Sequence, residues 1–382
     1  MSRAPQTLLS DEQRLDWLVL SRSQNVGPVL FYQLVNRFGG ARQALEALPE
    51  MARRAGRAKG PRIYPRQRAE QDIARAEAMG ARFVARGEAG YPPLLRHIPG
   101  PPPLLCIKGR SEIADEPMLA IVGSRNASVM GLKFTRQVAA ECARAGYVIT
   151  SGLARGIDTA AHEAATPRAT VAVLAGGLDH VYPRENARLM QAIGEEGLLV
   201  TEMTPGTTPR ADFFPRRNRL VSGMSLGVLV VEAARRSGSL ITARLAGEQG
   251  REVFAVPGSP LDPRADGANR LIRDGATLVT SANDLISELA PLAARSLPEA
   301  APLRSPGDMM EEAQEPRRIS REPPRELYPR LLALLGPAPV DMDSLIRESD
   351  APAGEVMAAL MDLELSGAIG RDAAGRIWLD NA

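Results

Sequence analysis

The stretch YVITSGLARGID at residues 147–158 runs from a short apolar segment directly into a turn of glycine, serine and arginine. The same order recurs in LAIVGSR at 119–125, TVAVLAGGLD at 170–179 and LGVLVVEAARRSGS at 226–239. Short apolar runs separated by helix-length segments are typical of buried parallel strands. Because the carboxyl ends of parallel strands lie at one edge of a sheet, we predict that these turns form a single rim. Its glycines, hydroxyls and guanidinium groups suit phosphates.

The alternation of apolar runs and helical segments continues from Met118 to about Ala290. This order predicts an α/β fold, namely an extended Rossmann-like, doubly wound sheet covered by helices. We assign residues 86–292 to this domain, with a rigid, proline-punctuated connector before its first strand. The remaining segments that carry the prediction are expected strands at 198–201, 252–256 and 277–279, expected helices at 132–144 and 186–193, and the connector at 91–103.

Residues 1–85 are predicted to form a helical domain. Ser10 precedes a segment with helical apolar spacing, and NVGPVL at 25–30 places a Gly-Pro turn before a second such segment. This order resembles a helix-hairpin-helix or SAM-like module, whose turn offers backbone N–H groups to a phosphate. Seven cations follow between Met51 and Arg68 with no acidic residue among them. They indicate either a solvated face or contact with nucleic acid or another anionic partner.

Residues 293–323 are rich in Pro, Glu, Arg and Ser and are predicted to be a flexible linker. Residues 324–382 combine three short helical segments with a terminal β-hairpin, which predicts a winged-helix-like domain. This domain holds five Arg, no Lys and ten Asp plus Glu, a net charge of −5. Domains that grip duplex DNA are normally basic, so contact with a protein, or with no partner at all, is favoured here.

Composition narrows the class of protein. The chain of 382 residues is 44% hydrophobic and 4% aromatic, with a formal net charge of +2, so any nucleic-acid site must be a local concentration of cations. Cys106 and Cys142 are too far apart in sequence to suggest a structural zinc or a disulfide framework. No signal peptide, membrane span or membrane partner is expected, and we predict a cytoplasmic protein.

The sequence lacks the motifs of several kinds of catalytic and cofactor-binding site. The first turn has no G-x-G-x-x-G, and the second strand ends at residues 150–152 without a carboxylate for a ribose, which disfavours NAD. The motifs of a P-loop and of a nucleophile elbow are also missing. His162 is expected to be structural, and Asp158 is either a base or, more in keeping with its place at a helix start, a capping residue. We therefore expect no cofactor and no metal.

Anion binding is the function that these residues fit. Glycine allows backbone N–H groups to approach an oxyanion, and arginine forms paired hydrogen bonds with phosphate oxygens. The densest cationic segment is FPRRNR at 214–219, which we place with Arg210 in a loop between strands. Donors spread over several strand ends suit a polymer backbone better than one small anion. Hydroxyls that add further donors are those of Ser124, Ser151, Ser237, Ser239 and Thr242.

These motifs, in this order, resemble the DprA/Smf (DNA processing protein A) family. The resemblance rests on GSR at 123–125, SGLARGID at 151–158, AGGLDHVYPREN at 175–186, FPRRNR at 214–219, and SGSLITA at 237–243 with VFAVPG at 253–258. It covers the whole α/β domain, and both flanking modules also fit.

The resemblance implies a non-enzymatic protein that binds and protects single-stranded DNA and loads RecA recombinase onto it during natural transformation. It also implies a homodimer formed through the Rossmann domain. The residues that we carry over as candidate DNA contacts are Gly123, Ser124, Arg125, Gly152, Arg155, Gly156, Asn186, Arg216, Arg217, Asn218, Arg219, Ser237, Gly238, Ser239, Thr242 and Asn269.

Two alternatives stay open. Nucleotide-processing phosphoribohydrolases of the lysine-decarboxylase-like (LOG) type also use glycine turns on a Rossmann sheet, but the turn at 237–243 lacks the glutamate of their P-G-G-x-G-T-x-x-E motif. In the second alternative, the chain is a protein-interaction adaptor whose terminal domains carry the function.

Overall fold

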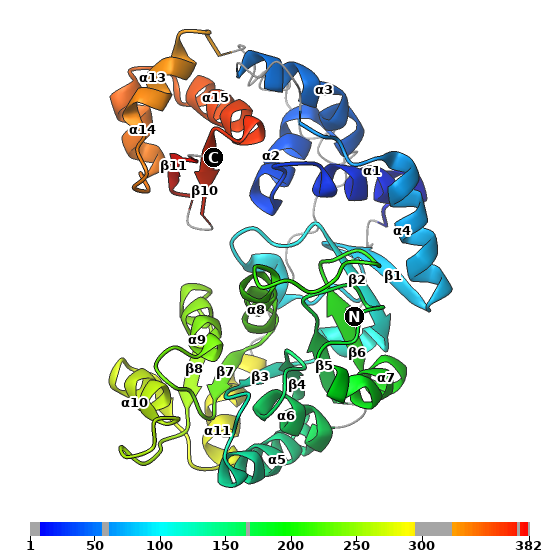
Figure 1. Ribbon diagram of the computed structural model, residues 1–382, viewed down its shortest axis with the longest axis vertical. Helices are drawn as coiled ribbons and strands as arrows, with labels where there is room; N and C mark the ends of the chain where they lie inside the picture. The colour runs from blue at the N-terminus through cyan, green and yellow to red at the C-terminus, as the bar shows by residue number, and fades with distance from the viewer. Residues whose placement is uncertain (1–7, 56–60, 166–168, 295–322, 373–374, 381–382) are drawn as a thin grey trace. The chain divides into compact units, whose positions relative to one another are not determined.

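The computed structural model describes residues 8–55, 61–165, 169–294, 323–372 and 375–380 (Figure 1). These residues divide into two compact units. The sheet unit comprises described residues from 72–98 and 104–294. The helical unit comprises those from 8–71, 99–103 and 323–380.

A nine-stranded sheet is the centre of the sheet unit (Figure 1). Its order is β1-β2-β6-β5-β4-β3-β7-β8-β9; the strands from β6 to β9 are parallel, and β2 runs antiparallel to both β6 and β1. The chain moves outward from β3 to β6 and then returns to the other side of β3, so the topological switch point lies between β3 and β7. The strands are Ala81–Ala85 (β1), Leu104–Gly109 (β2), Met118–Val122 (β3), Val148–Ser151 (β4), Thr170–Val173 (β5), Leu198–Thr201 (β6), Gly227–Val230 (β7), Glu252–Ala255 (β8) and Thr277–Leu278 (β9).

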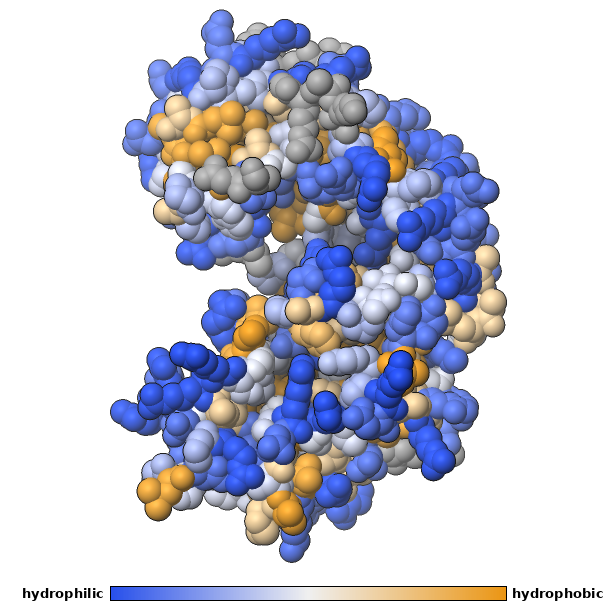
Figure 2. Space-filling view, viewed as in Figure 1, coloured by the Kyte–Doolittle hydropathy of each residue, from blue (hydrophilic) through white to orange (hydrophobic). Residues whose placement is uncertain are grey.

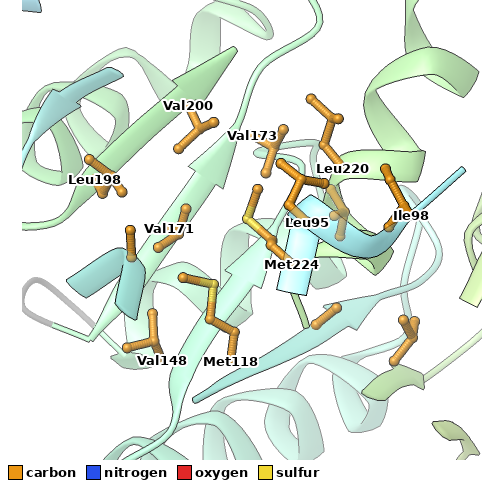
Figure 3. Close-up of a cluster of buried hydrophobic side chains, with 14 of the residues drawn as sticks. Leu95, Ile98, Met118, Val148, Val171, Val173, Leu198, Val200, Leu220 and Met224 are labelled. Carbon is orange, nitrogen blue, oxygen red and sulfur yellow. The ribbon is translucent and has the colours of Figure 1, made fainter. Parts of the chain in front are cut away.

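Helices cover both faces of the sheet. Alternate residues of β3 enter opposite cores: Ala120 and Val122 pack with α8 and α9, whereas Leu119 and Ile121 pack with α5, α6 and α11. Since both faces are buried, the central parallel strands are mainly apolar instead of alternating. Figure 3 shows part of the first core, where Leu220 of α8 and Met224, the residue after α8, meet the strands. The helices are Val129–Arg144 (α5), Ile157–Ala165 (α6), Ala187–Glu196 (α7), Phe213–Gly223 (α8), Gly238–Glu248 (α9), Asp266–Arg273 (α10) and Ala282–Ala294 (α11).

The fold class is as predicted, but two details of the sequence prediction need correction. The expected boundary at residue 85 assigned β1 to the helical domain, whereas β1 pairs with β2 and the sheet unit begins at Asp72. The antiparallel strands β1 and β2 were missed because they precede the strand–helix alternation that begins at Met118, and β2 follows directly on prolines. The expected connector also contains a short 3-10 helix, Leu94–His97 (η1).

The N-terminal module of the helical unit consists of α1 (Asp11–Arg22), α2 (Pro28–Phe38), α3 (Ala41–Arg54) and the first part of α4 (Arg66–Ala78). Local sequence explains its helix ends. The Ser10 side chain accepts a hydrogen bond from the Gln13 amide and forms a capping box, and Pro28 occupies the first turn of α2. Gly39 ends α2 with a φ of 81°, a conformation that glycine adopts without strain.

The C-terminal module, here called the winged helix, is built as predicted from three helices and a hairpin. They are α13 (Leu327–Leu334), α14 (Met342–Ser349), α15 (Ala353–Ser366), β10 (Ile369–Arg371) and β11 (Ile377–Leu379). Within the expected linker 293–323, α11 continues to Ala294, and residues 295–322 lie outside the described residues.

The viewed face of the sheet unit is mainly hydrophilic, with apolar residues in small separate patches (Figure 2). Of the helices that the structure describes, none has both the length and the hydropathy needed to cross a membrane.

Candidate nucleic-acid interface

The predicted rim encloses a hollow of about 580 Å³ beside the switch point between β3 and β7. Open α/β sheets bind ligands at this position, outside the carboxyl ends of the strands. Three turns and the start of α8 contribute to the hollow. The polar and glycine residues that line it are Gly123, Ser124, Arg125, Asn126, Gly152, Asp158, Arg217, Asn218, Arg236, Ser237, Gly238, Ser239 and Thr242.

The turns after β3 and β4 contact each other, and two glycines make this possible. A Cβ on Gly123 would lie 2.7 Å from Ile157 Cγ1, and one on Gly156 would lie 2.3 Å from the Ser124 carbonyl oxygen. Gly156 also has a φ of 79°, which favours glycine. The Ile157 amide donates to the Ser124 carbonyl over 3.2 Å. Gly123 and Gly156 are thus required for loop packing, whatever they contribute to a ligand.

Arg217 lies inside the rim and braces it. Its side chain is buried beneath Gly152, where a Cβ would come within 1.8 Å of Arg217 Nη1, and that nitrogen donates to the Val173 carbonyl over 2.8 Å. Burial lowers the pKa of Arg217 to about 10, so the guanidinium stays charged at neutral pH. Arg217 therefore acts as an internal brace of the rim, and it also lines the hollow where a phosphate contact is predicted.

Asp158 holds the turn after β4. Its Oδ2 accepts hydrogen bonds from the Gly152 amide over 3.1 Å and from the Ala154 amide over 3.2 Å. Burial raises the pKa of the Asp158 carboxyl, and the charge of Arg217 opposes that effect. These contacts fit the capping interpretation better than that of a base.

The segment 214–219 is not a loop, because it begins helix α8. Successive residues of a helix point about 100° apart, so its arginines diverge. Arg216 is exposed outside the set that lines the hollow, Arg217 points inward, and Arg219 forms a partly buried ion pair with Glu202. The candidate contact Asn218 lines the hollow, and its Nδ2 lies 3.4 Å from the Gly238 carbonyl oxygen.

The turn after β7 presents the N-terminus of α9 to the hollow. Ser237 caps this helix, accepting from the Ser239 amide over 3.3 Å, and the two hydroxyl oxygens lie 2.7 Å apart. A Cβ on Gly238 would find no described atom within 4 Å, so this part of the rim is open. Backbone N–H groups and hydroxyls at a helix start favour an anion. The candidate contacts Ser237, Ser239 and Thr242 all line the hollow, with Thr242 the most deeply buried.

Three other candidate contacts serve the scaffold or lie outside the hollow. Asn186 Nδ2 donates to the Leu153 carbonyl and to Thr159 Oγ1, both over 2.9 Å. Asn269 exchanges two hydrogen bonds with the backbone of residue 258, at 3.0 and 2.9 Å. Arg155 is exposed and lies 3.4 Å from Glu185. An asparagine amide satisfies loop backbone groups as readily as it binds phosphate, and sequence does not distinguish these uses.

Sequence reasoning missed three residues that line the hollow: Asn126, Phe214 and Arg236. The Phe214 ring lies 5.4 Å from the Arg125 guanidinium carbon and packs against the Tyr182 ring at 5.5 Å. Phe214 and Arg236 lie in motifs that were singled out for their other residues. Their exposure at the rim depends on the start of α8 and on the course of the turn after β7.

Comparison with known proteins identifies the family of the chain. A family model described as DNA recombination-mediator protein A matches residues 82–290. A DprA-like N-terminal HHH domain matches 11–75, and a DprA winged helix domain matches 315–375. The chain belongs to the DprA/Smf family. The resemblance inferred from its motifs is thereby confirmed.

Named relatives span most of the chain. Protein Smf of Synechocystis is 32% identical over 392 residues, covering 95% of this chain and 98% of that protein. Protein Smf of Escherichia coli is 38% identical over 322 residues, covering 84% and 83%.

Two solved DprA structures are also similar. The crystal structure of DprA from Streptococcus pneumoniae has a TM-score of 0.60 at 33% identity, covering 74% of this chain and 99% of that one. A structure of DprA from Helicobacter pylori, described for its single-stranded DNA binding mode, has a TM-score of 0.50 at 32% identity and covers 52% and 93%.

Proposed function

We propose that this chain binds single-stranded DNA in the rim hollow and performs no chemistry on it. The observation that carries the proposal is the convergence of donors from three strand ends on one open hollow, with Arg125 and Arg236 exposed at its edge. Phosphates of a flexible strand can follow such a surface, and an aromatic ring such as Phe214 offers a stacking face for a base. The Helicobacter relative's single-stranded DNA binding mode supports the same ligand.

The composition of the hollow argues against the hydrolase alternative. Asp158 is the one carboxylate among the described residues that line it, and two backbone amides already occupy one oxygen. General acid–base catalysis needs a titratable group within reach of the substrate. Release of free base from nucleoside monophosphates by the purified protein would restore the hydrolase interpretation.

The family resemblance extends the proposal to partners. We expect the bound strand to be protected and passed to RecA recombinase, and two copies of the chain to associate through the sheet unit. Stimulation of RecA assembly on oligonucleotides coated with single-strand-binding protein tests the first expectation, and light scattering tests the second.

A titration of fluorescent oligo(dT) at several salt concentrations tests the binding site. Each phosphate contact that is lost should reduce the slope of log K against log salt by about 0.7. Arg125→Ala and Arg236→Ala should each weaken binding and reduce that slope. The matched control is Arg244→Ala, which removes an exposed arginine of α9 that pairs with Glu248 and does not line the hollow.

Equal effects of the rim and control substitutions would refute the proposed site. Binding of duplex DNA as tight as that of oligo(dT) would refute the proposed preference for single strands.

A further inference from the structure

Helix α15 belongs to two hydrophobic cores of the helical unit. Val356, Leu360 and Leu363 pack in the core of the winged helix. Met361 and Leu365, one turn apart, instead pack in the core of the N-terminal module, with residues of α1, α2 and α3. Nearly the whole surface of the second half of α15 is therefore in contact with protein.

Polar contacts join the same two modules. Asp362 of α15 is fully buried; it accepts a hydrogen bond from the Tyr328 hydroxyl over 2.5 Å and lies 3.5 Å from Arg54 Nε of α3. The Asn25 side chain donates to the Leu365 carbonyl over 3.0 Å. A buried carboxylate is tolerated only with such partners, so Asp362 requires Arg54 to remain close.

The contacts cover the elements that would otherwise bind nucleic acid. In helix-turn-helix folds the last helix of the motif enters the DNA groove, and α15 holds that place before the hairpin. In the N-terminal module the predicted phosphate site was the turn at 25–30. Asn25 of this turn is bonded to α15, and Val26 is buried in the shared core.

The opposite net charges of the N-terminal module and the winged helix favour their association. Residues 8–71 hold eleven Arg plus Lys and six Asp plus Glu, a net charge of +5, against −5 for residues 324–382. Within the basic run, for which a solvated face and contact with an anionic partner were both left open, Arg54 pairs with Asp362 of the winged helix. Arg53 and Arg66 pair within their own module, with Glu50 and Asp16.

We propose that the winged helix is a protein-docking module whose partner is the N-terminal helical module of the same chain. While the two are docked, α15 and the turn at 25–30 are withheld from nucleic acid, and DNA binds through the sheet unit alone.

Hydrogen exchange on the full chain tests this proposal with two substitutions one helical turn apart. Met361→Asp places a charge in the shared core, whereas Met357→Asp places the same charge on α15 where the side chain is 44% exposed. The amides of α3 should exchange at least tenfold faster in Met361→Asp and at the wild-type rate in Met357→Asp. The difference should not depend on protein concentration, because docking occurs within one chain.

A second variant distinguishes loss of docking from unfolding of the winged helix by Met361→Asp. Asn25→Asp leaves the winged helix untouched but replaces the donor to Leu365 with an acceptor. It should speed exchange in α15. Wild-type exchange of α3 in Met361→Asp together with wild-type exchange of α15 in Asn25→Asp would overturn the proposal.

Hydrogen exchange in the presence of nucleic acid tests whether α15 and the turn at 25–30 are withheld from DNA. Saturating oligo(dT) or a duplex oligonucleotide should leave exchange at 25–30 and 353–366 of the wild-type chain unchanged. New protection there by either oligonucleotide would show that these elements bind DNA and would also overturn the proposal.

Discussion

Gly152 is the position where the rim leaves least room for a side chain. A Cβ at this residue would lie 1.8 Å from Arg217 Nη1 and 2.3 Å from its Cζ. The guanidinium cannot move aside without losing the hydrogen bond to the Val173 carbonyl and its position near Asp158. Gly152→Ala therefore forces the loop or the buried arginine out of place.

The expected cost follows from these two effects. Overpacking a tight interior site costs about 1–3 kcal/mol, and loss of a hydrogen bond from a charged donor adds about 1.5–3 kcal/mol. The sheet unit should lose about 3 kcal/mol of unfolding free energy or more. For a unit of this size that corresponds to a fall in Tm of about 6–12 °C.

Thermal unfolding followed by far-UV circular dichroism measures this shift. The two tryptophans, Trp17 and Trp378, both lie in the helical unit, so their fluorescence should melt at an unchanged temperature. Gly238→Ala is the matched control, because no described atom lies within 4 Å of its Cβ position. It should change stability by about 0.5 kcal/mol or less. A Gly152→Ala protein that melts with the wild type would refute the account of Arg217 as an internal brace.

Three further predictions concern the sheet unit. Burial lowers the pKa of His162 to about 3, below its unfolded value of 6.5, so the stability that the neutral ring contributes is lost as pH falls below 6.5. Between pH 7 and pH 5, the free energy of unfolding measured in urea should fall by about 2 kcal/mol more for the wild type than for His162→Gln. Glu232 accepts from the Ser128 amide over 2.9 Å, so Glu232→Gln should lower Tm and weaken oligo(dT) binding, whereas the exposed Glu248→Gln should do neither. Phe214→Leu should weaken oligo(dT) binding by about 1–3 kcal/mol without changing its salt slope, since stacking is lost but no charge; an altered slope would contradict this.

Much of the architecture could be predicted from local patterns. Continuous apolar runs identify strands buried on both faces, and glycine turns directly after them identify the edge where a ligand binds. Capping and turn residues such as Ser10, Pro28 and Gly39 act over a few positions, so they place helix ends from sequence alone. The antiparallel strands β1 and β2 lie before the strand–helix alternation, and the pairing of β2 with β6 depends on residues far apart in the chain.

The sequence alone determined the parallel strands, the glycine rim and the order of the three modules, because short-range periodicity and turn chemistry specify them. Only the tertiary structure decided which donors face the hollow. Arg217 and Arg219 are close neighbours on α8, yet one enters the interior and the other meets Glu202, the residue after β6. Long side chains take their direction from helix rotation and from partners on distant segments. For the same reason, the sequence does not show that α15 packs against the N-terminal module. Its second apolar face has the same pattern as a face that packs inside its own domain.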